Sequence, residues 1–88
     1  MPIISSFYGI TIRMYCEPNS PHNVPHLHAE YQGKEAVYDF EGNMIEGDIP
    51  SARARLVVAW ITIHQETLEK CWNLLQNGEG FIKIHPLR

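Results

Sequence analysis

About halfway along its 88 residues, the chain changes from a two-residue repeat of hydrophobic positions to a helical one. In the first half, apolar and polar side chains alternate, which is typical of strands with one buried face. The first predicted strand, residues 6–16, divides into an apolar and a polar face: Ile10, Ile12 and Met14 on one, Thr11, Arg13 and Tyr15 on the other.

A second alternating run follows a loop rich in proline and asparagine, which is predicted from Glu17 to Pro25. This second strand begins near His26. Its pattern places Leu27, Ala29 and Tyr31 on one side and His26, His28 and Glu30 on the other. Three of the five histidines of the chain therefore lie in or just before this strand.

Two further strands are predicted by turn signals. Gln32 and Gly33 are typical of a tight hairpin, so residues 34–40 form a third strand beside the second. A second turn at Gly42 and Asn43 leads to a short fourth strand over residues 44–47. All these connections are local, which predicts a β-meander.

From Asp48 onward the hydrophobic repeat lengthens to about 3.6 residues, which predicts a helix. Asp48 or Ser51 can cap its start, Pro50 suits the first turn, and Gly78 suits its end. A straight helix from Pro50 to Asn77 would be about 40 Å long, longer than the roughly 30 Å width of a domain of this size. We therefore expect a break near His64 and Gln65 or a projecting end that contacts another subunit, and the acidic residues after His64 favour the break. The residues of this repeat share one side of the predicted helix and form an apolar stripe of Leu56, Val57, Trp60, Ile61, His64, Leu68, Cys71, Trp72 and Leu75.

The last alternating stretch, residues 81–85, is predicted as a short edge strand that Pro86 ends. The whole pattern predicts an α+β fold. A small, mostly antiparallel meander of three or four strands is followed by one long or broken helix on one face and the C-terminal edge strand. A chain of this length has material for a single core, so residues 1–88 are expected to form one domain.

Composition narrows the class of function. The apolar fraction of 44% fits a folded protein. Ten acidic against seven basic residues give a net charge of −3, which disfavours nucleic-acid binding through phosphate neutralisation. No apolar run approaches the roughly 18 residues of a membrane span. With two cysteines and no recognisable signal peptide, a cytoplasmic protein is expected.

The histidines admit three interpretations, which the residues alone leave open. His26, His28 and Glu30, with His22 from the preceding loop, have the residue types of a site for a divalent transition metal. His26 and His28 with Arg13 and Tyr15 on the neighbouring strand could instead act in acid–base catalysis, as in a small hydrolase or ribonuclease. In the third interpretation, these imidazoles are structural or surface groups without a chemical role.

Several segments together resemble a known family. The stretches "GITIRMY", "PHLHAEY", "IEGDIP", "RLVVAWITIHQETLEKCW" and "IHPL" are similar, in order and spacing, to the bacterial proteins grouped as domain of unknown function 4160. The family's proline-proline-histidine-aromatic-histidine core corresponds to residues 24–28. Valine and leucine replace the first proline and the aromatic residue, and both imidazoles remain. His22 lies outside this core.

The resemblance implies a protein partner encoded nearby and a pairing of the toxin–antitoxin type. We therefore expect a cytoplasmic protein-interaction module, with a small hydrolase or ribonuclease that uses His26 and His28 as the alternative. Self-association is a further expectation, because the aromatic helix stripe is large for so small a domain.

Overall fold

The described part of the chain forms two layers, a five-stranded sheet and a pair of helices. The computed structural model describes residues 2–15 and 24–88. Cys16 at the end of the predicted first strand and the predicted loop residues up to Asn23, including His22, therefore lie outside the described residues. The strands are β1 (Ile3–Phe7), β2 (Ile10–Arg13), β3 (His26–Tyr31), β4 (Lys34–Asp39) and β5 (Met44–Gly47). The helices are α1 (Ser51–Ile63) and α2 (Gln65–Gln76). The predicted α+β class is confirmed.

The sheet is a simple antiparallel meander in the order β1-β2-β3-β4-β5. It has five strands, so the prediction of three or four was wrong. The predicted first strand, residues 6–16, divides at a turn in which Tyr8 and Gly9 have φ values of 49° and 78°. Two consecutive positive φ values are typical of a type I′ hairpin turn, and this turn allows residues 3–7 to form the additional strand β1.

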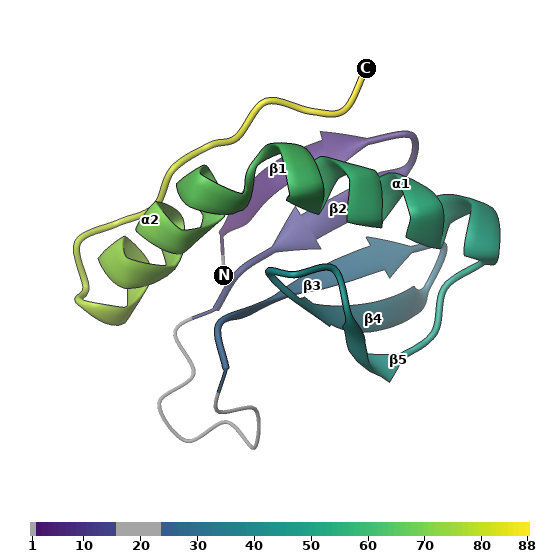
Figure 1. The fold of residues 1–88 in the computed structure, drawn as a ribbon, viewed down its shortest axis with the longest axis horizontal. Coiled ribbons are helices and arrows are strands. Elements are labelled where there is room, and N and C mark those ends of the chain that lie inside the picture. Colours follow the sequence, from purple (N-terminus) through teal and green to yellow (C-terminus); the bar gives the residue numbers. More distant parts are fainter. Residues whose placement is uncertain (1, 16–23) are drawn as a thin grey trace.

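Both helices cover the same face of the sheet (Figure 1). The alternating residues Ile10, Ile12, Leu27, Ala29 and Ala36 are fully buried with the helix residues Val57, Trp60, Ile61, Leu68 and Cys71. The opposite face carries Arg13, His28 and Glu30, and no helix in the described ranges covers it. A one-sided sheet of this kind is common when strands are antiparallel, because the second face can be solvated.

The helical segment breaks at His64, as favoured by the sequence. The backbone N–H of His64 lies 3.1 Å from the Trp60 carbonyl oxygen and 3.2 Å from that of Ile61, and α2 begins at the next residue. At that point the Gln65 side-chain amide donates a hydrogen bond of 2.8 Å to the Phe40 carbonyl oxygen. Burial, and secondarily the nearby His85, lowers the pKa of His64, so this junction favours a neutral imidazole.

The two ends of the helical segment differ from each other in capping. Pro50 occupies the N-cap position of α1 without a side-chain hydrogen bond, so the predicted capping by Asp48 or Ser51 was wrong. The end of α2 follows the prediction: Gly78 has a φ of 70°, and the Glu79 N–H donates to the Leu74 carbonyl oxygen at 2.8 Å. Neither helix is long and apolar enough to span a membrane, among the residues that the structure describes.

The C-terminal segment runs beside β1 without forming a strand (Figure 1), so the predicted edge strand over residues 81–85 was wrong. One backbone bond of 2.8 Å, from the Ile84 N–H to the Ile4 carbonyl oxygen, joins the segment to β1. Its other anchors are side chains: the Trp60 indole donates to the His85 carbonyl oxygen at 2.8 Å, and the Ile82 N–H lies 3.4 Å from the Cys71 sulfur. Through these contacts, the C-terminal segment covers the outer edge of β1.

Gly47 at the end of β5 is the glycine whose replacement should cost most. Its φ is 82°, and an added Cβ would overlap the Glu35 carbonyl oxygen of β4. We expect Gly47→Ala to lower the free energy of unfolding by about 3 kcal/mol. Gly33→Ala is the matched control, since its φ of 81° is similar but nothing lies within 4 Å of the added atom. This control should cost about 1 kcal/mol, and urea unfolding followed by tryptophan fluorescence measures both. Equal losses would show that the overlap with Glu35 is relieved without cost.

Candidate functional site

Strand β3 places the two motif histidines in different environments. Leu27 and Ala29 are buried on the helix side, while His28 and Glu30 lie on the uncovered face, as the alternation predicts. His26 was expected on that exposed face as well, but only 1% of its surface is exposed. The cause is α2, whose Trp72 ring lies 5.3 Å from the His26 ring and covers it. The His26 Nδ1 is also 2.8 Å from the Val24 carbonyl oxygen.

A row of aromatic rings connects the uncovered sheet face to α2. Tyr15 meets His28 edge to face at 4.5 Å, and His28 lies 5.4 Å from His26. The row continues from His26 to Trp72 and from Trp72 to Phe40, with centroids 5.3 Å and 6.2 Å apart. Such edge-to-face and tilted arrangements are favourable for aromatic pairs. The row therefore holds His26 between a helix and a solvated sheet face.

Three of the four residues considered for catalysis surround the fourth, His28. Arg13 is the direct cross-strand neighbour of His28, and the rings of Tyr15 and His26 both contact it. Arg13 also forms an ion pair with Glu30, with 3.1 Å between Nε and Oε2. The Glu35 carboxylate lies 3.6 Å from the His28 Nδ1, an ion pair when His28 is protonated. The geometry can thus place an acid–base group beside a phenol and a guanidinium.

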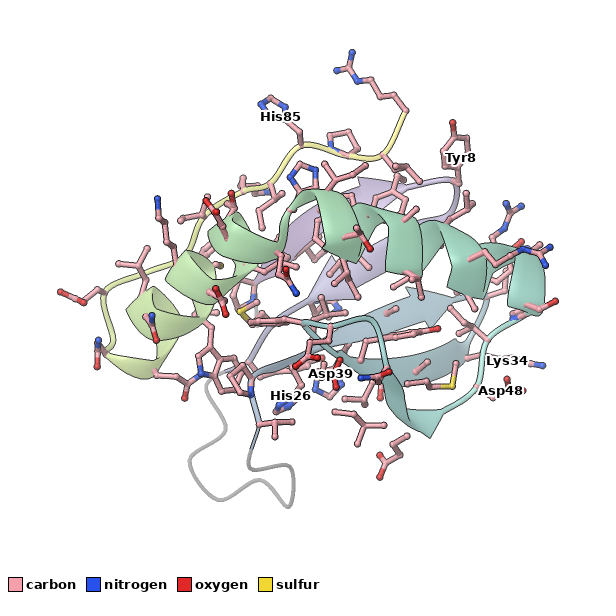
Figure 2. All side chains as sticks on the ribbon, viewed as in Figure 1. Tyr8, His26, Lys34, Asp39, Asp48 and His85 are labelled. Atoms are coloured by element: carbon pink, nitrogen blue, oxygen red, sulfur yellow. The ribbon has the colours of Figure 1, made fainter. Side chains whose placement is uncertain are left out.

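The residues considered as metal ligands are not assembled in the same way. His22 lies outside the described residues. Within residues 2–15 and 24–88, no group of three or more histidine, cysteine, aspartate or glutamate side chains is placed to hold a metal ion. The Glu30 carboxylate is engaged by Arg13, and the His26 Nδ1 faces the Val24 carbonyl. His85, which was not among the predicted ligands, also lies far from His26 in the view of Figure 2, on the other side of the helices.

A groove adjoins His26 between the end of β4 and α2. It consists of two hollows of about 460 Å³ and 320 Å³ that share Pro25 and Glu69 in their walls, and we call it the β4–α2 groove. Four of its lining residues are hydrophobic: Val24, Pro25, Phe40 and Trp72. Pro25 precedes His26 in the histidine motif. The motif therefore supplies one wall of the groove, Pro25, and the buried His26 ring that packs against Trp72.

Acidic side chains surround this apolar floor. Asp39, Glu41, Glu66 and Glu69 line the groove, and no lysine or arginine is among the described residues that line it. Asp39 is also the cross-strand neighbour of His26, and Figure 2 shows the two side by side. The groove therefore collects four of the ten acidic residues of the chain.

Asp39 holds a fixed charge at one end of this groove. Its Oδ1 accepts hydrogen bonds of 2.9 Å from the N–H groups of Glu41 and Asn43, and its Oδ2 accepts one of 3.1 Å from the Asn43 side chain. Burial by itself would raise the pKa of Asp39, but hydrogen bonds from Asn43, Glu41 and Gly42 outweigh it and lower that pKa. Glu41, Glu66 and Glu69 are exposed, so their carboxylates face solvent.

Sequence patterns did not identify the groove. Trp72 was assigned to the apolar stripe of the helix, and Glu66 and Glu69 were noted only as acidic residues after the break. Phe40 and Glu41 belong to a strand end and a turn, more than twenty residues earlier. The one available signal was the helix break itself, because it predicts that the second half of the helical segment changes direction and meets a different part of the sheet.

Comparison with known proteins gives one match. The family described as "Domain of unknown function (DUF4160)" matches residues 9–73, about three quarters of the chain. This range includes β2 to β5, α1 and most of α2, with the histidine motif and all residues that line the groove. No curated protein and no solved structure matches the chain significantly.

The different burial of the two histidines leads to a stability prediction. We expect His26→Ala to lower the free energy of unfolding by about 2 kcal/mol, because it leaves a cavity under Trp72. His28→Ala should cost about 1 kcal/mol, and exposed His85→Ala at most about 0.5 kcal/mol. Chemical denaturation at neutral pH measures all three. A loss for His28→Ala as large as for His26→Ala would contradict the structural role assigned to the buried ring.

Proposed function

This chain belongs to the DUF4160 family, and we propose that it is a cytoplasmic protein-interaction module that forms one half of a two-protein pair. The observation that carries the proposal is the β4–α2 groove, in which an apolar floor lies inside an acidic rim. Val24 and Pro25 are exposed on this floor, Trp72 is half-buried, and Phe40 is buried beneath them. Water-exposed aromatic and aliphatic surface is stabilised when a partner covers it, and a charged rim supplies specificity and fast association. The partner is a protein encoded nearby, in a pairing of the toxin–antitoxin type.

The rigidity of the groove supports this function. One wall, Pro25, is adjacent to the buried His26, and the Trp72 ring is held between His26 and Phe40. The opposite wall is fixed by the hydrogen bond from Gln65 to the Phe40 carbonyl oxygen. A preformed site loses little side-chain entropy on binding, which favours affinity in a small interface.

The test is co-expression of the chain with the protein encoded next to it, followed by purification through the neighbour. Wild-type chain should co-purify. The double variant Glu66→Lys, Glu69→Lys should be lost from the complex, because the charge of the rim is inverted. Glu79→Lys is the control, since Glu79 is exposed and lies outside the groove, and it should co-purify like the wild type. Absence of the wild-type chain from the complex, or recovery of a self-associated form alone, would refute the pairing.

The alternative function is a small hydrolase or ribonuclease, metal-dependent or not. The observation that favours it is the convergence of Arg13, Tyr15 and His26 on His28. In this arrangement His28 would exchange the proton, Tyr15 would orient or donate, and Arg13 would stabilise negative charge on a phosphoryl group. The net charge of −3 is a cost for an RNA substrate.

Hydrolysis of single-stranded RNA and of an activated phosphodiester tests this alternative. His28→Ala and Tyr15→Phe should each reduce the rate by about a hundredfold or more, with a melting temperature close to that of the wild type for Tyr15→Phe. Addition of EDTA separates the metal-dependent from the metal-independent form. Equal rates for wild type and His28→Ala would exclude catalysis by this set of residues.

A further inference from the structure

The β4–α2 groove has a composition that restricts the chemistry of its occupant, and this inference rests on the proposed function. Glu66 and Glu69 are three residues apart on α2, so they lie on the same side of the helix. Glu69 lines both hollows, together with Pro25, and Trp72 follows it by one further helical step. A side chain entering the groove therefore meets an aromatic ring and a carboxylate at the same point.

A hydrated metal ion would use the carboxylates but not the floor. Val24, Pro25, Phe40 and Trp72 offer no metal ligand, and the described residues contain no ligand cluster of three or more. An uncharged apolar segment would cover the floor but desolvate the acidic rim without compensation. The occupant that satisfies both parts combines an apolar stem with a positively charged head.

We propose that the groove binds an arginine side chain within an apolar segment of the partner protein. The aliphatic stem packs against Pro25, and the guanidinium stacks on Trp72 and forms an ion pair with Glu69. Arginine fits better than lysine because its planar head can stack on an aromatic ring and donate two parallel hydrogen bonds to one carboxylate. Glu66 and Asp39 add attraction from the adjoining hollow.

An NMR titration with defined peptides tests the inference on the intact chain. The probe is a blocked hexapeptide of alternating leucine and arginine, and the matched control replaces all three arginines with citrulline, which keeps the shape and removes the charge. The arginine peptide should shift the Trp72 indole N–H and the backbone amides of Glu66 and Glu69 in a saturable way. The affinity of the citrulline peptide should be lower than that of the arginine peptide by a factor of about ten or more.

Two variants complete the experiment. Glu66→Gln, Glu69→Gln should weaken the arginine peptide by about tenfold, whereas Glu79→Gln should leave its affinity unchanged. Equal affinity of the arginine and citrulline peptides, absence of saturable shifts, or shifts centred outside the groove would overturn the inference. If the neighbouring protein co-purifies but any of these results is found, the proposed pairing is retained and the inference that the groove binds arginine is rejected. If the arginine peptide binds at the groove but the neighbouring protein does not co-purify, the arginine site is retained and the proposed pairing is rejected.

Discussion

The break between α1 and α2 at His64 determines which residues of α2 meet His26 and line the β4–α2 groove. A straight helix over residues 51–76 would extend about 39 Å, whereas the longest dimension of the molecule is 34 Å. Ending α1 at Ile63 and starting α2 at Gln65 keeps both helices on the sheet. The second helix then buries Leu68 and Cys71 in the core and brings Trp72 over His26. The direction that α2 takes after the break therefore places a helix beside the histidine motif.

The two imidazoles of the histidine motif, His26 and His28, consequently have different roles. Alternation along a strand suggests that His26 and His28, separated by one leucine, act together. In the structure, the first imidazole is a packing element between Trp72 and His28, and the second lies on the solvated face beside Arg13 and Tyr15. Pro25, the residue before them, forms a wall of the groove. Loss of His26 should therefore disturb the groove through Trp72 as well as the arrangement around His28.

Local physics accounts for most of the predicted fold. Leu27 and Ala29 face inward because polar and apolar residues alternate there, and Gln32 and Gly33 adopt the positive φ values that their turn requires. The extra strand β1 was missed because its pairing with β2 is irregular between Ile3 and Ser5, so Ile4 and Ser5 are both buried and the alternation is lost. The burial of His26 and the groove depend on contacts between residues about 46 positions apart, such as His26 and Trp72, which no local pattern encodes.

The two candidate surfaces differ in what they gain from a partner. On the uncovered sheet face, the Arg13 guanidinium is paired with Glu30, and long polar side chains lie beside one another. Such a face is stable in water, and its ion pairs add little to binding because a partner would have to desolvate them. In the groove, Val24 and Pro25 are exposed and Trp72 is half-buried. The carboxylates of Glu41, Glu66 and Glu69 have no lysine or arginine beside them among the described lining residues. Covering the groove with a basic, partly apolar segment removes apolar surface from water and brings opposite charges together, so this surface has the larger favourable free energy to gain.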